Sequence, residues 1–219
     1  MARGVATVLG LTLTVLPPAA QACDVALLLA IDVSNSIDAA EYRLQTDGLA
    51  DALLDPEIAE ALLQAEAALA VVQWSGVDRQ VLVQDWARMR SLTDIRVFAD
   101  LARGSERAFV LSDTAPAEAL MFSLDQFTAV QDCKRRIIDV SGDGTANAGA
   151  DVRGLGREAE RRGVTINGLA IESMGRAITT YFERAIITSD GFVMTARGHR
   201  EYPQTIRRKI LREVSATLF

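Results

Sequence analysis

The chain has 219 residues, of which 49% are hydrophobic and 24% are charged, the composition of an ordinary globular protein. Its formal net charge of −6 at pH 7 makes binding to nucleic acid or another polyanion unfavourable. The basic residues are scattered except in "RGLGREAERR" and "TIRRKILR", which we interpret as solvated faces of helices.

The N-terminus, "MARGVATVLGLTLTVLPPAAQAC", has the pattern of a secretory signal peptide. A basic start is followed by an apolar run, two prolines and an A-x-A cleavage signal, which argue against a buried helix. The apolar run is too short for a stable membrane anchor. We therefore predict that residues 1–22 are removed on export. Residues 23–219 would then form one domain without a membrane-spanning segment, in the periplasm or secreted.

Strand-like and helix-like patterns alternate along the rest of the chain. Continuous apolar runs and period-two alternation predict strands at 24–34, about 67–75, 78–86, 134–144, 164–172 and 191–196. Helical spacing of apolar residues predicts helices at 38–54, 91–104, 114–130, 151–163, 177–186 and 202–219. The second and third strands are close enough to form a hairpin. This order predicts an α/β domain with a doubly wound, mostly parallel sheet, one antiparallel edge strand and helices on both faces.

The two cysteines, Cys23 and Cys133, each lie at the start of a predicted strand. An even number of cysteines in an exported protein suggests one disulfide. The two strands can be parallel neighbours that start at the same end of the sheet, so a bridge between them is geometrically reasonable. Cys23 would also be the first mature residue, which leaves lipid modification as an alternative. Gln21 fits a lipidation signal badly.

Two predicted strands end in residues with side-chain oxygens. Asp32, Ser34 and Ser36 form a D-x-S-x-S turn after the first strand, and Asp143 lies in "SGDG" after another. Thr114 begins a helix in "LSDTAP" between them. Ligands of open α/β sheets bind at the carboxyl ends of strands near the switch point. Carboxylates and hydroxyls are hard ligands that suit Mg²⁺, or Mn²⁺ or Ca²⁺, better than zinc or copper.

From about residue 24 to its end, the chain resembles the von Willebrand factor A domain. The oxygen cluster resembles that family's metal-ion-dependent adhesion site, and "VVQWSG" is similar to the family's second strand. "CDVALLLAIDVSNSID" is most similar to secreted bacterial members of unknown function. The resemblance implies five metal ligands, with the hydroxyls reaching the metal directly and the aspartates directly or through water: Asp32, Ser34, Ser36, Thr114 and Asp143.

The threonine of this set departs from the family pattern. The family usually has glycine before it, whereas Asp113 stands here. Asp113 could add negative charge near the metal or cap the following helix, and Thr114 itself could be a plain helix N-cap.

The resemblance implies a metal-dependent protein-binding module outside the cytoplasm. An open metal position would accept an Asp or Glu carboxylate from a partner protein or peptide. Two alternatives stay open: a metal-dependent hydrolase that uses the same cluster, and a metal-free structural scaffold. We predict that the chain is not an enzyme, because it lacks a G-x-S-x-G elbow, a P-loop and an H-E-x-x-H motif. Its only histidine, His199, is expected at the surface.

Overall fold

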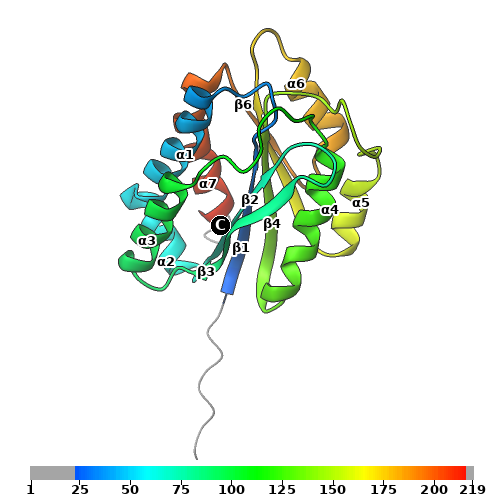
Figure 1. The fold of residues 1–219 in the computed structure, drawn as a ribbon. Helices are drawn as coiled ribbons and strands as arrows, with labels where there is room; N and C mark the ends of the chain where they lie inside the picture. Colours follow the sequence, from blue (N-terminus) through cyan, green and yellow to red (C-terminus); the bar gives the residue numbers. More distant parts are fainter. Residues whose placement is uncertain (1–22, 216–219) are drawn as a thin grey trace, which may run out of the picture.

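The central sheet has six strands in the order β3-β2-β1-β4-β5-β6. Figure 1 shows this sheet between two groups of helices. All neighbouring strands pair in parallel except β2 and β3, which form an antiparallel pair at one edge. The predicted doubly wound, mostly parallel sheet with one antiparallel edge strand is therefore confirmed. The computed structural model describes residues 23–215. The predicted signal peptide at residues 1–22 lies outside the described residues, as do residues 216–219.

The strands follow the aliphatic runs of the sequence. The residues of β1 and β2 are almost all buried, because helices cover both faces of the sheet at these positions. The edge strand β3 stays partly exposed. The strands are β1 (Cys23–Asp32), β2 (Ala68–Trp74), β3 (Gln80–Arg88), β4 (Cys133–Gly142), β5 (Thr165–Ile171) and β6 (Val193–Ala196).

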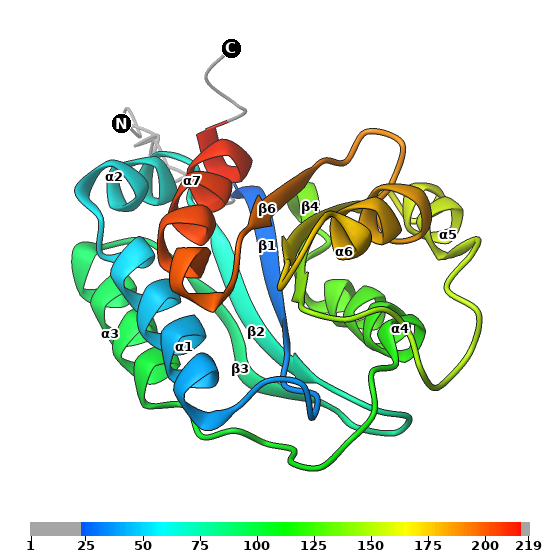
Figure 2. The same cartoon turned by 90° about the horizontal axis from the view of Figure 1, so that it is seen from above.

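The helices form two layers, with α1, α2, α3 and α7 on one face of the sheet and α4, α5 and α6 on the other (Figure 2). Each layer encloses its own hydrophobic core against the strands. The helices are α1 (Ala39–Leu53), α2 (Pro56–Gln64), α3 (Leu92–Gly104), α4 (Pro116–Gln126), α5 (Leu155–Arg161), α6 (Ala177–Tyr181) and α7 (Tyr202–Ser215).

Local sequence signals explain where several helices begin. In α1, Asp38 and Glu41 form a reciprocal capping box, and in α3 the Ser91 hydroxyl accepts a hydrogen bond from the Asp94 amide. The helix α2 was missing from our sequence prediction, although Asp55 caps it and Pro56 stands at its first turn.

Two other helices differ in length from the sequence prediction. The helix α5 is shorter than predicted, because Gly154 before it has a left-handed φ of 97°. The helix α6 passes into a π-helical turn at Phe182–Ile186.

The disulfide between Cys23 and Cys133 joins the first residues of β1 and β4. The two residues are register partners in the parallel pair, and their Cα atoms are 4.5 Å apart. The predicted disulfide is thus confirmed. It connects positions 110 residues apart, and in the chain-entropy model a loop of this length stabilises the fold by about 4–5 kcal/mol.

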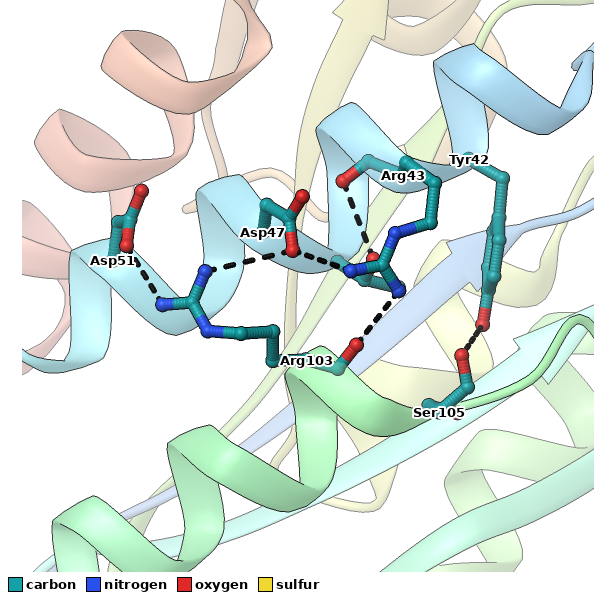
Figure 3. A network of polar contacts seen from close by, with 7 residues as sticks. Tyr42, Arg43, Asp47, Asp51, Arg103 and Ser105 are labelled. Atoms are coloured by element: carbon teal, nitrogen blue, oxygen red, sulfur yellow. Dashed lines mark hydrogen bonds and ion pairs between the residues drawn. The ribbon is translucent and has the colours of Figure 1, made fainter.

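A polar network fastens α3 to α1 (Figure 3). The Arg103 guanidinium contacts the carboxylates of Asp47 at 3.5 Å and Asp51 at 2.7 Å. The Tyr42 hydroxyl donates a hydrogen bond of 3.0 Å to the carbonyl of Ser105. Exposed ion pairs of this kind are each worth less than about 1 kcal/mol. The ion pairs of Arg103 fix the C-terminal end of α3, and the Tyr42 hydrogen bond fixes Ser105, the first residue of the loop that follows.

A charged cluster is buried beneath α7. Lys209 is 0% exposed, and its Nζ lies 2.7 Å from Oδ1 of Asp139 on β4 and 2.6 Å from Oε1 of Glu213. The side chain of Asn167 on β5 also donates to Glu213, at 2.8 Å. Our interpretation of "TIRRKILR" as a solvated face is therefore wrong for Lys209. The helix turns this residue towards the sheet, where Asp139 interrupts an aliphatic strand.

The single histidine also differs from the prediction. His199 is only 8% exposed, and its Nδ1 lies 3.1 Å from Oε1 of Glu41 in the first turn of α1. The expected surface position is wrong, because the segment before α7 packs against the start of α1. In the described residues 23–215, no helix is long and apolar enough to cross a membrane.

Replacing Lys209 by Met should destabilise the protein strongly, because it leaves the carboxylate of Asp139 buried without its cation and removes the hydrogen bond to Glu213. We expect a loss of about 3–5 kcal/mol in the free energy of unfolding, measured by urea denaturation. The exposed neighbour Arg208 is the control, and Arg208→Met should change this free energy by less than about 0.5 kcal/mol. Equal effects of the two substitutions would contradict the assignment.

Glu213 should make stability depend on pH. Burial, followed by the negative charge of Asp139, raises the pKa of its carboxyl from 4.5 to about 8. The folded state thus holds this proton to higher pH than the unfolded chain does. The resulting stabilisation is complete below about pH 4.5 and is lost as the pH rises towards 8. The urea midpoint of the wild type should fall more steeply over this range than that of Glu213→Gln, and parallel profiles would refute the linkage.

Candidate metal centre

Three loops at the carboxyl edge of the sheet bring the predicted site residues together. Asp32 is the last residue of β1, and Ser34 and Ser36 follow in the turn that leads into α1. Asp143 follows directly on the last residue of β4. Thr114 arrives from the loop between α3 and α4, which passes this edge of the sheet in Figure 2. Since β1 and β4 are neighbouring parallel strands, their carboxyl ends lie side by side.

Short polar contacts link four of the five residues. The amide of Ser34 donates to Oδ1 of Asp32 at 2.7 Å. The hydroxyls of Ser34 and Ser36 are 3.2 Å apart, and the Ser36 hydroxyl donates to Oδ1 of Asp143 at 2.5 Å. Asp32 and Ser34 are 0% exposed, whereas Ser36 is exposed and Asp143 is half-buried. The cluster therefore has a buried floor and an accessible rim.

Thr114 lies beside the turn that follows β4. Its amide donates to the side-chain oxygen of Asn147 at 2.8 Å, and its own side chain is buried. A Cβ on Gly144 would lie 3.8 Å from its hydroxyl oxygen. The N-cap of α4 is Ala115, and no side chain of the described chain caps this helix. The alternative in which Asp113 or Thr114 serves as a helix cap is therefore wrong.

Asp32 carries a buried and incompletely compensated carboxylate. Burial, to which the negative charge of Asp143 adds, raises its pKa from 3.8 to about 7. Its Oδ2 has no hydrogen-bond partner among the described residues. A buried carboxylate of this kind is stabilised in its charged form by a nearby cation.

The residues present fit a hard divalent cation. Two carboxylates and the hydroxyls of Ser34 and Ser36 converge, and the Thr114 hydroxyl lies beside the neighbouring turn at Gly144. Gly142 provides space, because a Cβ at this position would lie 3.0 Å from Oδ2 of Asp32. Within residues 23–215, no group of three or more His, Cys, Asp or Glu side chains could hold a metal ion. A metal at this edge would thus depend on hydroxyl ligands as well as carboxylates, a donor set typical of oxygen-binding cations.

Two supporting residues were not identified from the sequence. The Arg107 guanidinium donates to the carbonyl of Val33 at 2.8 and 3.2 Å and to the carbonyl of Ser34 at 2.6 Å. The buried side chain of Gln73 donates to the carbonyl of Glu106 at 3.0 Å and accepts from the amide of Ala108 at 2.8 Å. A glutamine inside the apolar run "VVQW" was a usable signal for a buried polar contact. Arg107 has no comparable local signal.

A model of the family described as "Protein of unknown function (DUF1194)" matches residues 22–218. No curated protein sequence matches the chain significantly.

Solved structures are similar to the chain in fold. Proximal thread matrix protein 1 from the mussel byssus is 18% identical, with a TM-score of 0.65 over 86% of this chain and 47% of that protein. A von Willebrand factor type A protein from Catenulispora acidiphila is 15% identical, with a TM-score of 0.62 over 89% and 43%. The pilus adhesin SpaC from Lactobacillus rhamnosus GG is 12% identical, with a TM-score of 0.65 over 88% and 31%.

The chain spans less than half the length of each of these three proteins. A second structure of the mussel protein, 17% identical with a TM-score of 0.61 over 87% of this chain and 45% of that protein, is described as having a zinc-occupied MIDAS motif. MIDAS is the metal-ion-dependent adhesion site. These likenesses show that the chain has the fold of a von Willebrand factor A domain, as its sequence resemblance implied.

Arg107 should fix the turn that carries Ser34 and Ser36. Replacing it by Met removes charge-assisted hydrogen bonds to two carbonyls, and we expect a loss of about 1.5–3 kcal/mol in the free energy of unfolding. Amide hydrogen exchange over residues 33–37 should also become faster. The exposed Arg96 on α3 is the control. Exchange in Arg107→Met no faster than in Arg96→Met would show that Arg107 does not hold the turn.

Proposed function

We propose that this chain, which belongs to the DUF1194 family and has the fold of a von Willebrand factor A domain, is an exported binding module. It would bind a protein or peptide partner through a divalent metal. The observation that carries this proposal is the buried carboxylate of Asp32. Its Oδ2 lacks a hydrogen-bond partner among the described residues, at a point where hydroxyls and a second carboxylate converge.

The metal would be held by Asp32, Ser34, Ser36, Thr114 and Asp143. Mg²⁺ fits this set best, because few carboxylates and several neutral hydroxyls suit an ion that keeps bound waters and open positions. Mn²⁺ or Ca²⁺ is compatible with the same hard oxygen donors. The zinc-occupied MIDAS motif of the mussel protein supports a divalent cation at this edge of the fold.

The accessible rim of the site favours a binding role. Ser36 is exposed and Asp143 is half-buried, so a partner can approach from solvent while Asp32 and Ser34 hold the floor. When bound, the metal would supply a Lewis-acidic position that accepts an Asp or Glu carboxylate. The chain's own residues would fix the position of the metal, and the surrounding loops would determine which partner binds. The pilus adhesin among the similar structures supports an adhesion-type role.

Export is supported by the disulfide, since such bonds persist in oxidising compartments, and by the pattern of residues 1–22. The sulfur of Cys23 is bonded to Cys133, and a lipid on the same sulfur would exclude that bond. We therefore favour a periplasmic or secreted protein over a lipid-anchored one.

Isothermal calorimetry with Mg²⁺ and Mn²⁺ tests the proposed function. The wild type should bind, and Asp32→Asn, which keeps the shape but removes the charge, should lose the binding heat. The matched control is Asp100→Asn, because Asp100 is an exposed carboxylate on α3 that is not among the proposed ligands. Its metal affinity should stay within about twofold of the wild type.

Other results would favour one of the two alternative functions, the metal-free scaffold or the metal-dependent hydrolase. Absence of metal binding by the wild type would favour a metal-free scaffold. Metal-dependent hydrolysis of a phosphoester or peptide, lost in Asp143→Ala, would favour the hydrolase.

A further inference from the structure

The loop between α3 and α4, residues 105–115, is fastened to the body of the protein along most of its length. Gln73 and Arg107 hold its first half, as described above. The guanidinium of Arg79 lies 6.0 Å from the ring centre of Phe109. At its far end, Thr114 bonds to Asn147. A long loop with this many contacts presents its remaining residues in a fixed place.

Between these contacts the loop is held between two turns of the sheet. The amide of Asn35 donates to the carbonyl of Ser112 at 2.9 Å, and the amide of Gly76 donates to the hydroxyl of Ser112 at 3.2 Å. The Ser75 hydroxyl donates to the carbonyl of Asp113 at 3.0 Å. Asn35 stands between two of the proposed metal ligands in sequence. The segment before Thr114 therefore adjoins the candidate metal centre directly.

Three apolar side chains of this loop and of the neighbouring β2–β3 turn are exposed to solvent. Val110 is 59% exposed, Leu111 is 85% exposed, and Val77, next to Gly76 on the β2–β3 turn, is 48% exposed. Leu111 also has a φ of 51°, in the left-handed region that bulky residues rarely adopt. We call Val77, Val110 and Leu111 the apolar patch. An unfavourable backbone conformation that displays a leucine to solvent beside a binding site points to a role in recognition.

We propose that the apolar patch is the part of the partner-binding surface that determines which partner binds. The partner is a protein segment in which an Asp or Glu lies next to a bulky aliphatic or aromatic residue. This inference rests on the proposed function: the carboxylate would go to the metal, and the neighbouring apolar side chain would cover Leu111. Burial of an apolar anchor beside a charged contact is how interfaces combine affinity with specificity.

Selection of a random 12-residue peptide library on the immobilised chain tests whether the preferred partner places an acidic residue next to a bulky apolar one. Peptides are bound in Mg²⁺ and released with EDTA. The proposal predicts recovered sequences with an acidic residue flanked by Leu, Ile, Val, Phe, Tyr or Trp. The affinity of one recovered peptide is then measured for the wild type, for Leu111→Asn and for Leu101→Gln. Asparagine tolerates a left-handed φ, so Leu111→Asn keeps the loop conformation. Leu101, 59% exposed on α3, is the matched control.

Leu111→Asn should bind the peptide about tenfold or more weakly, because it no longer buries an apolar side chain. Its Mg²⁺ affinity should match that of the wild type, and Leu101→Gln should bind the peptide normally. Acidic, EDTA-sensitive peptides without an apolar neighbour, or an unchanged affinity of Leu111→Asn, would overturn this inference and leave the proposed function standing. A selection that yields no EDTA-sensitive peptide would overturn both.

Discussion

The parallel pairing of β1 with β4 is the constraint on which the rest of the structure depends. It places Cys23 beside Cys133 at the amino end of the two strands and aligns Ile31 with Ser141 near the other end. One covalent bond fixes the start of the pair, and Asp32, Ser34, Ser36 and Asp143 lie at its other end or directly after it. Because β1 also pairs with β2 in parallel, the switch in strand order falls where Asp32 emerges. Open α/β sheets bind their ligands at this point.

The third contributor to the candidate centre is a loop rather than a strand, and the buried side chain of Gln73 and the half-buried one of Arg107 hold it in place. Gln73 lies within β2 and bonds to the first residues of the loop, while Arg107 reaches from the loop to the carbonyls of the β1–α1 turn. Such contacts stabilise a defined loop conformation because each leaves a buried polar group satisfied. The loop thereby brings Thr114 to a site whose other members come from β1 and β4.

The sequence was most informative where a residue's role depended on its own strand or helix. Aliphatic runs predicted the strands because both faces of the sheet are covered, and D-x-S-x-S after a strand indicated which edge would carry the oxygens. The resemblance to a known family added Thr114, which has no local pattern of its own. Lys209 and His199 were misplaced because their burial depends on Asp139 and Glu41, distant partners that no helical periodicity specifies. Arg107 was missed for the same reason, since its partners are backbone carbonyls.

The distance along the chain between the two halves of the oxygen cluster has a consequence for folding. Ser36 and Asp143 are in direct contact although they are 107 positions apart in the sequence. Contacts this distant form only after the entropy of closing a long loop has been overcome, and they slow folding relative to local contacts. The candidate centre cannot assemble until β4 has docked on β1, so a chain that stops short of this step has neither the disulfide nor the cluster. Occupancy of the centre would then report completed folding.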